Sequence, residues 1–248
     1  ADLEKASRIV LYPSENEKSA ISLVNIFSVE TLSKAFFDEY TLHYNKFVEN
    51  IEKSNYRKSV FSIDYPLKAT KKDIDIANKS IRDFVKKLLG RIVFLYFVQK
   101  KGWLGASDLE YNDGDPDFIF NLFKSSGANE TFYSNWLSNL FFKTLNEQRT
   151  NDVFKMPNNT SVKIPYLNGG LFDPEDYDNK LLTFIPTLFH SVDFEDTPLT
   201  DKLIKKKDTN HRGFLDFLNA FNFTVHEDSP EDHTVAVDPE MLGHIFEN

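Results

Sequence analysis

Apolar positions are most regularly spaced between residues 72 and 102. They first fall on one side of a predicted helix and then, further along the chain, on every side of it. At about 100° per residue, six apolar residues fall on one side of a helix while Lys79, Arg82 and Lys86 fall on the other. The six are Ala77, Ile81, Phe84, Val85, Leu88 and Ile92. Residues 92–98 are apolar on every side, which predicts burial at the centre of the domain. The run is short enough for a strand, but its continuity with the preceding pattern favours a helix that Gly102 ends.

Further helices are predicted where apolar residues recur at steps of three and four. Ser28 is suited to cap a helix whose apolar face runs through residues 32–51. Residues 54–70 are expected to form a loop. Shorter helices are expected over residues 118–124, 131–146 and 214–218.

Two regions alternate between apolar and polar residues with a period close to two, which is typical of strands. Residues 153–164 are interrupted by Pro157, Asn158 and Asn159 and predict a small hairpin. Residues 221–225 and 234–237 predict a second hairpin, joined by an acidic loop. The whole pattern predicts a mainly α fold, an irregular helical bundle with one or two small β hairpins.

The two ends of the sequence favour a fragment of a longer protein. Residues 1–27 show weak helical periodicity without a start signal, as expected for the tail of a preceding domain or a linker. Asp238 and Pro239 are well suited to begin a helix, yet the sequence ends at Asn248 without a stop signal. We therefore expect residues 28–248 to form one helical domain that is truncated before a further domain.

The composition is that of an ordinary folded protein with an unusual share of aromatic residues. Hydrophobic residues make up 41% of the 248 residues, charged residues 27% and aromatic residues 15%, with 24 Phe. Cysteine is absent from the sequence, which excludes disulfides, thiol catalysis and thiolate zinc sites. No run of about 18 apolar residues occurs. These features predict a soluble, cytoplasmic protein without membrane contact.

The distribution of charge is more informative than the formal net charge of −9. Residues 66–103 hold ten basic residues and three acids, a local balance of ten minus three, or +7. Residues 171–201 hold eight acids against Lys180 alone, and residues 226–248 hold seven acids with no Lys or Arg. Separate patches of opposite sign suit a domain that contacts DNA on one side and protein on another. A mixed solvated surface is the alternative interpretation.

Common catalytic and cofactor motifs are missing from the sequence. The nine Gly residues form no G-x-G-x-x-G and no P-loop, and no G-x-S-x-G elbow occurs. Gly169 and Gly170 are expected to form a turn with positive φ. No H-x-x-x-H pair occurs, and the nearest histidines, His226 and His233, are seven residues apart, so a metal site there is not favoured.

Two polar clusters remain as candidates for chemistry. Asp173, Asp178 and Lys180 are the closest match to the carboxylates and lysine of a metal-dependent nuclease. Their spacing is too short for two strands, so ordinary surface acids are the favoured interpretation. Residues 205–207, all Lys, and the later His211 and Arg212 are expected to form a solvated basic loop, with phosphate contact as the alternative.

Five blocks of sequence resemble a known family when they are taken in order. They are FSVETLSKAFFDEY at 27–40, RIVFLYFVQKKGWL at 91–104, YLNGGLF at 166–172, FNFT at 221–224 and VAVDPEMLGHIFE at 235–247. Together they resemble the helical region of single-chain type IIG restriction endonucleases fused to an adenine-specific DNA methyltransferase. The matched residues are mostly aromatic, aliphatic and turn residues, so no catalytic, cofactor-binding or metal-binding residue is carried over.

The resemblance implies a helical connector between a preceding nuclease domain and a following methyltransferase domain. It also implies a parent enzyme that uses S-adenosylmethionine and Mg²⁺, flips an adenine out of the duplex and methylates its exocyclic amine. The family's glycine-rich cofactor motif and Asn-Pro-Pro-Tyr-type motif are expected beyond Asn248, and this sequence contains no Asn-Pro pair.

We therefore predict a connector that supports DNA-backbone binding and is catalytically inert alone. The expected partners are double-stranded DNA and the adjoining nuclease and methyltransferase domains. One alternative is a divergent Mg²⁺-dependent nuclease, and another is a pure interdomain spacer without DNA contact. The predicted DNA-binding residues are Lys71, Lys72, Lys79, Arg82, Lys86, Lys205, Lys206 and Lys207.

Overall fold

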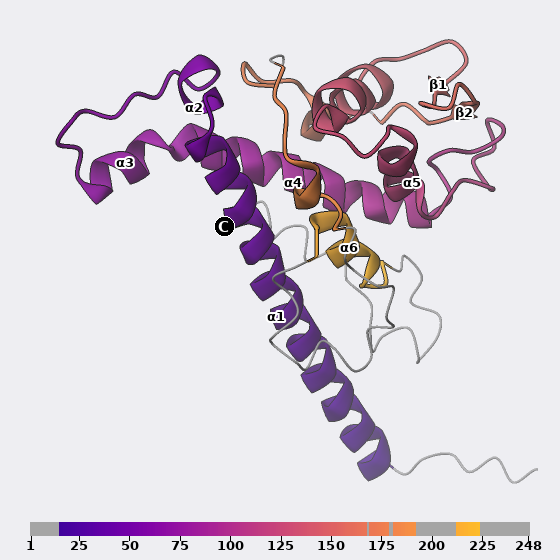
Figure 1. The fold of residues 1–248 in the computed structure, drawn as a ribbon. Helices are drawn as coiled ribbons and strands as arrows, with labels where there is room; N and C mark the ends of the chain where they lie inside the picture. The colour runs from indigo at the N-terminus through magenta and orange to yellow at the C-terminus, as the bar shows by residue number, and fades with distance from the viewer. Residues whose placement is uncertain (1–14, 168, 179–180, 192–211, 224–248) are drawn as a thin grey trace, which may run out of the picture.

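The computed structural model of the chain describes residues 15–167, 169–178, 181–191 and 212–223, with side chains from residue 34 onward. Its described part is mainly helical and contains one small antiparallel sheet, which confirms the predicted fold class (Figure 1). Within these residues, no helix combines the length and the apolar character needed to cross a membrane.

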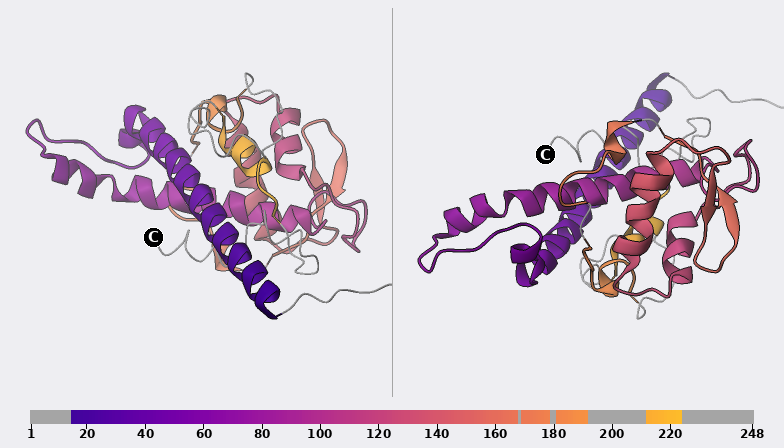
Figure 2. Two further views of the ribbon diagram at one scale, coloured as in Figure 1. Left: turned by 90° about the horizontal axis from the view of Figure 1, so that it is seen from below. Right: turned by 90° about the horizontal axis from the view of Figure 1, so that it is seen from above.

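Two long helices cross, and the remaining elements are arranged around them (Figures 1 and 2). Helix α1 spans Glu15–Lys53 and α4 spans Lys79–Lys100, and the two are in direct contact. Ser28 lies inside α1, so the prediction that it caps the helix is wrong, because the helix already begins at Glu15. Four buried apolar residues of α1 recur at steps of four and seven, which places them on one face: Phe36, Tyr40, Phe47 and Ile51.

The predicted helix over residues 72–102 is two helices. Helix α3 spans Lys71–Ala77, and α4 follows after Asn78, whose φ of −81° and ψ of 6° leave the helical region. An Asn side chain competes with helical hydrogen bonding by forming its own contacts, and Asn78 is buried among such contacts. The predicted end of the helix is confirmed, since Gly102 has a φ of +76° just after Lys100.

The all-apolar stretch of α4 lies at the centre of the core, as predicted. Between residues 92 and 98 every side chain is buried except Phe94, which packs partly buried against the core. Helix α6 (Phe214–Asn219) and the residues just after it add further aromatic rings to this core. The rings of Phe97 and Phe223, for example, are 5.0 Å apart at 85°, the edge-to-face arrangement that aromatic pairs favour.

Two further predicted helices and one predicted hairpin are also present in the described residues. Helix α5 spans Phe118–Ser125, and the predicted helix over 131–146 consists largely of two π-helical segments, η1 (Phe132–Leu137) and η2 (Leu140–Leu145). Strands β1 (Val153–Lys155) and β2 (Ser161–Lys163) form the first predicted hairpin, with Phe154 opposite Val162. The second predicted hairpin lies almost wholly outside the described residues. Short helical turns complete the chain: α2 (Tyr56–Ser59), η3 (Gly170–Phe172) and η4 (Pro186–Leu188).

Glycines shape the backbone at two places, and the sequence had indicated only the first of them. Gly169 and Gly170 lie at a turn, but the predicted positive φ is wrong, because Gly169 has a φ of −166° and is extended. Gly213 is the N-cap residue of α6, and a Cβ there would lie 2.3 Å from the backbone nitrogen of His190. Only glycine therefore lets α6 approach the backbone that follows η4.

Candidate nucleic-acid interface

The loop before α3, together with α3, forms an arm, defined here as residues 62–77. In every ribbon view α3 and this loop extend away from the crossing of α1 and α4 (Figures 1 and 2). No residue of α3 is buried, and the apolar side chain of Ile76 keeps 62% of its surface exposed. Helix α3 therefore offers most of its surface to other molecules, while Ile63 at the start of the arm is buried in the core.

Polar contacts at the base hold the arm in one position. The hydroxyl of Tyr65 donates to Asn78 Oδ1 at 2.6 Å, and Asn78 Nδ2 donates to Glu52 Oε1 of α1 at 2.5 Å. The guanidinium of Arg57 lies 4.1 Å from the centre of the Tyr65 ring and donates to the carbonyl of Ile63 at 3.0 Å. Because Asn78 is only 2% exposed, water competes little for these bonds. The arm is thus an ordered projection.

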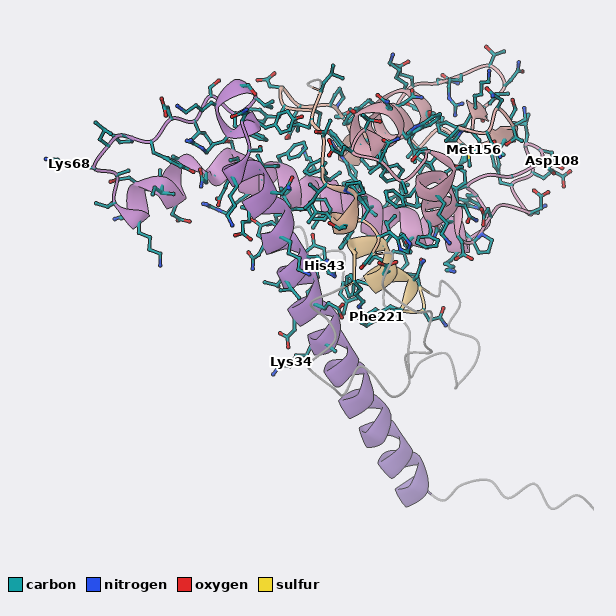
Figure 3. The ribbon with its side chains drawn as sticks, in the orientation of Figure 1. Lys34, His43, Lys68, Asp108, Met156 and Phe221 are labelled. Carbon is teal, nitrogen blue, oxygen red and sulfur yellow. The ribbon has the colours of Figure 1, made fainter. Side chains whose placement is uncertain are left out.

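The tip of the arm, defined here as residues 66–72, begins with a tight turn. Its closing hydrogen bond runs from the N–H of Ala69 to the carbonyl of Pro66 at 2.9 Å, so Leu67 and Lys68 take the two central positions. Lys68 lies at the far end of the arm (Figure 3). Lys68, Lys71 and Lys72 are exposed, and the tip contains no acidic residue, so it carries a net charge of three minus zero, or +3.

Two cations at the start of α4 are already paired with acids. Arg82 Nη1 lies 3.0 Å from Asp75 Oδ1 and also donates to the Asp75 carbonyl at 2.8 Å, which ties α4 to α3. Lys79 pairs with Asp83, one helical turn further along α4. These pairs reduce the positive charge that Lys79 and Arg82 present to an outside partner.

The remaining acids of the arm are engaged as well. Asp73 accepts from the hydroxyl and the N–H of Thr70 at 2.7 and 2.9 Å, and Thr70 in turn caps α3. The Thr70 hydroxyl first, and then its N–H, lower the pKa of the Asp73 carboxyl. Asp64 pairs at 2.9 Å with Lys58, a residue that lies outside the arm. None of these acids forms an ion pair with the three lysines of the tip in the described structure.

The structure brings five of the eight predicted DNA-binding residues together along α3 and the first two turns of α4: Lys71, Lys72, Lys79, Arg82 and Lys86. They differ in what they offer, because Lys79 and Arg82 are paired and Lys86 is half-buried. Residues 205–207 lie outside the described residues. Lys68 was missed among the predicted contacts, although the preceding Tyr65-Pro66 pair marks a turn that would expose it.

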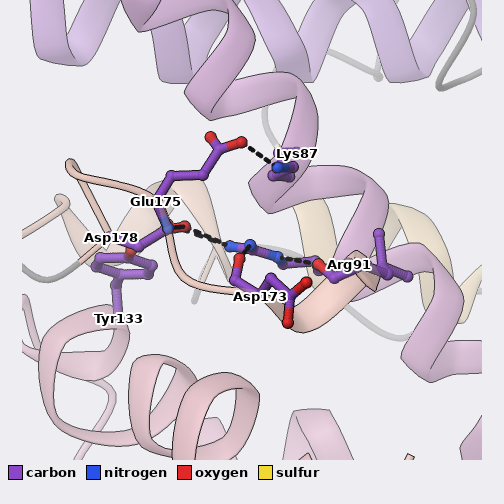
Figure 4. Close-up of polar contacts among 7 residues, drawn as sticks. Lys87, Arg91, Tyr133, Asp173, Glu175 and Asp178 are labelled. Carbon is purple, nitrogen blue, oxygen red and sulfur yellow. Dashed lines mark hydrogen bonds and ion pairs between the residues drawn. The ribbon is translucent and has the colours of Figure 1, made fainter. Parts of the chain in front are cut away.

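The proposed nuclease acids belong to a different part of the molecule. Asp178 is 4% exposed and accepts from Nη1 of Arg91, itself 1% exposed, with both of its oxygens at 3.1 Å (Figure 4). The hydroxyl of Tyr133 donates to Oδ1 of Asp178 at 3.3 Å, and the N–H of Glu175 donates to Oδ2 at 3.0 Å. Burial, and secondly the charge of Asp178, raise the pKa of Tyr133 well above its ordinary value, so its hydroxyl remains a donor.

The guanidinium of Arg91 is satisfied on its other sides by backbone carbonyls. Nε donates to Leu171 at 2.8 Å, and Nη2 donates to Asp173 at 2.9 Å. Asp173 itself is exposed, and Lys180 lies outside the described residues. Among the described residues, no group of three or more His, Cys, Asp or Glu side chains could hold a metal ion. Asp178 therefore serves as an internal counter-ion that joins the 171–178 segment to α4.

A second buried ion pair corrects the interpretation of Arg212. Arg212 is 7% exposed and pairs through two nitrogens with both carboxylate oxygens of Glu39 on α1, so it does not belong to a solvated basic loop. His43, one turn along α1, is fully buried and stacks on Phe217 at 5.2 Å. Its Nε2 lies 3.7 Å from Glu39 Oε1, and neither ring nitrogen has a hydrogen-bond partner in the described structure.

An open groove of about 630 Å³ lies between the C-terminal part of α1 and η4. Its cations include Lys53, which pairs with Glu49, and Arg212, which pairs with Glu39. Burial lowers the pKa of a third cation, Lys46. The groove is therefore less suited to an anionic ligand than the tip of the arm.

Comparisons with known proteins give a family and one curated relative. The profile of the family described as "Domain of unknown function (DUF7814)" matches residues 37–236. A protein of Methanocaldococcus jannaschii named "Putative type II restriction enzyme and methyltransferase RM.MjaORFECS2P" is 26% identical over 167 residues. The match covers 67% of this chain but only 12% of that relative's length. No solved structure matches the chain.

Proposed function

We propose, from the premise that this chain belongs to the DUF7814 family, that it is the helical connector of a restriction-modification enzyme and supports binding to the DNA backbone. The name of the curated relative supports the connection to restriction and modification. The match covers only 12% of that relative's length. The activities of the whole enzyme are therefore proposed here and do not follow from the comparison. In this proposal a nuclease domain and an adenine-specific methyltransferase domain adjoin the connector.

The tip of the arm is the observation that carries the proposal. Lys68, Lys71 and Lys72 stand on an ordered projection, and the acids nearby are engaged elsewhere. Closely spaced cations without acidic partners favour a polyanion, since binding releases the counterions condensed on DNA. Contacts of this kind orient a duplex without reading its sequence. The chain thereby contributes affinity and orientation, while target recognition and chemistry belong to other domains.

The cofactors of the proposed parent enzyme are S-adenosylmethionine for methyl transfer and Mg²⁺ for cleavage. The described residues do not provide a metal-binding cluster, and Asp178 is occupied by Arg91. In this proposal both cofactors are held by other domains of the parent enzyme. The role of the chain's own side chains in the proposal is to hold phosphates.

The proposal is tested by measuring how the isolated chain binds a labelled duplex by fluorescence anisotropy. We expect weak binding whose affinity falls steeply between about 50 and about 200 mM salt. Replacing Lys68, Lys71 and Lys72 by Gln should weaken binding and reduce the salt slope by about 1 for each lysine that contacts a phosphate. The matched control replaces Lys34, Lys143 and Lys155, exposed lysines outside the arm, by Gln.

The control variant has the same change in net charge and should bind like the natural chain. Binding that is undiminished in high salt would contradict the proposal, because phosphate contacts must compete with salt. Equal losses in the tip and control variants would also contradict it, since they would indicate a general effect of net charge. An unchanged tip variant would place the DNA contacts outside the tip, and a natural chain that does not bind the duplex would support a spacer without DNA contact.

A further inference from the structure

Leu67 is the most exposed large apolar residue of the described structure, and it stands among the free cations of the tip. Its relative exposure is 106%, compared with 78% for Leu181 and 62% for Ile76. A single exposed leucine is ordinary on a protein surface. Leu67 differs because a hydrogen-bonded turn fixes its backbone at the far end of an ordered arm. A partner of the tip must therefore receive an apolar side chain that is bordered by cations.

The charges around Leu67 restrict the partner to one with an anionic surface. Lys68 follows it directly, and Lys71 and Lys72 begin α3. The three lysines lie within a stretch of five residues, and closely spaced cations suit the row of phosphates along a nucleic-acid strand. An apolar side chain beside them is best received by an apolar interior behind the phosphates, and in the DNA of the proposed function the stacked bases provide one.

We propose that Leu67 is a wedge that enters the minor groove of duplex DNA and partly separates two base pairs, while the tip lysines contact the flanking phosphates. Proteins that bind the minor groove insert Leu, Ile, Phe, Met or Pro between base steps and kink the duplex. The minor groove is about 6 Å wide, too narrow for a helix but open to a side chain on a tight turn. This inference rests on the proposed function and gives it a site and a mode of binding.

The base of the arm is built to resist the force that wedging requires. Separating a base step costs a few kcal/mol of stacking, so a freely moving loop would bend away before the bases part. Tyr65 and Asn78 fix the two ends of the arm to each other, and Glu52 fixes Asn78 to α1. The Thr70 cap joins the turn to α3. The leucine is therefore presented on a support that is anchored to the core.

The test uses a duplex whose central TA step carries the fluorescent base 2-aminopurine, with donor and acceptor dyes at its ends. TA steps are easily kinked, and 2-aminopurine becomes brighter when it loses its stacking neighbours. With the natural chain we expect brighter 2-aminopurine and energy transfer that reports a bend of about 20–90°. Leu67→Ser should abolish both signals and keep the salt slope, because the lysines remain.

Leu109→Ser is the matched control, since Leu109 is an exposed leucine, at 56%, beside Asp108, which lies at the opposite end of the molecule from Lys68 (Figure 3). It should leave bending and fluorescence unchanged. If Leu67→Ser bends and unstacks the duplex like the natural chain, the wedge is overturned while the proposed function stands. If the natural chain fails to bind the duplex at low salt, the proposed function itself fails.

A photoreactive benzoylphenylalanine at position 67 identifies the partner directly. We expect it to crosslink to the DNA strands when the chain is mixed with the duplex. Crosslinks only to protein, either a second copy of the chain or the adjoining domains of the whole enzyme, would overturn the wedge in favour of a docking contact. Binding to vesicles that contain phosphatidylserine, lost in Leu67→Ser and without any crosslink to DNA, would overturn it in favour of a lipid surface.

Discussion

The arm and the centre of the fold differ in whether their charged side chains are buried and paired or exposed and unpaired. At the centre, Arg91 and Asp178 are both buried, and nearly every polar atom around them has a partner. On the arm, acids are engaged close to their own helices and three lysines are left exposed. A buried ion pair that is fully hydrogen-bonded holds segments of one chain together, whereas exposed cations without acids are available to another molecule. The comparison separates residues that maintain the fold from residues that serve binding.

The largest expected effect comes from breaking the central ion pair. Asp178→Ala leaves the guanidinium of Arg91 buried without its counter-ion, which costs about 3–5 kcal/mol of unfolding free energy. Urea denaturation followed by circular dichroism measures this loss. The control is Asp173→Ala, which removes an exposed carboxylate and should change stability by less than about 0.5 kcal/mol. A stable Asp178→Ala variant that loses Mg²⁺-dependent DNA cleavage would instead support the nuclease alternative.

A smaller effect is expected where α6 meets the backbone after η4. Gly213→Ala places a methyl group 2.3 Å from the backbone nitrogen of His190, so the backbone must shift. Overpacking of this kind typically costs about 1–3 kcal/mol, which would appear as a lower urea midpoint. Gly169→Ala is the matched control, because a Cβ there meets no atom within 4 Å and the backbone is extended. Equal stabilities of the two variants would show that the close approach at Gly213 is relaxed at no cost.

A pH-dependent effect is expected from His43. Burial lowers the pKa of His43, and Lys46 and Arg212 act in the same direction against the opposing Glu39. The unfolded chain therefore takes up a proton first, and stability is lost as pH falls below the unfolded value of about 6.5. One pH unit below this value the loss is at most about 1.4 kcal/mol. Urea midpoints at neutral and mildly acidic pH measure the loss, and His43→Phe should reduce its dependence on pH.

The same region should lose further stability at lower pH. Burial alone would raise the pKa of Glu39, but the neighbouring His43 and Arg212 outweigh it and hold the pKa below its ordinary value of 4.5. Stability from the Glu39–Arg212 pair is therefore complete above that value and is lost as pH falls through the lowered pKa. A chain whose urea midpoint is constant across both ranges would contradict the assignment of these groups as buried and coupled.

The smallest effect is expected at the paired cations of α4. Lys79 and Asp83 are exposed and one turn apart, so replacing them by Gln and Asn should change stability by about 0.3–0.5 kcal/mol at most. DNA affinity should fall less for Lys79→Gln than for Lys71→Gln, because Lys79 is already held by Asp83, whereas Lys71 forms no ion pair in the described part of the chain. Anisotropy with the labelled duplex measures the DNA affinities of both single variants. A larger loss for Lys79→Gln would mean that the pair opens to contact phosphate.

Local patterns predicted the parts of the fold that depend on neighbouring residues. The one-sided and all-round apolar stretches of α4, the short helices α5 and α6, and the β1–β2 hairpin are all confirmed, because burial and side-chain alternation repeat within a few residues. The helix boundary at Asn78 was missed, since the contacts that stabilise the break come from Tyr65 and Glu52.

Distant contacts account for what the sequence could not indicate. Arg91 was counted among the basic residues of its segment, yet its partner Asp178 is 87 positions away, and Arg212 meets Glu39 across 173 positions. No local pattern distinguishes such cations from exposed ones. On the arm the sign of the charge was predicted, but which lysines stay unpaired depends on the Arg82–Asp75 and Lys79–Asp83 pairs. The contacts of residues 71–86 and 205–207 with DNA stay predictions.

The enclosure of Arg91 also has a consequence for the order in which the protein can be made. Its acceptors lie 80 to 87 positions later in the chain, at Leu171, Asp173 and Asp178. During synthesis α4 leaves the ribosome well before any of them, with a guanidinium that has to stay in water until they arrive. The central part of α4 therefore cannot close over its apolar surface early, and shortened chains that end before residue 171 should expose that surface and aggregate.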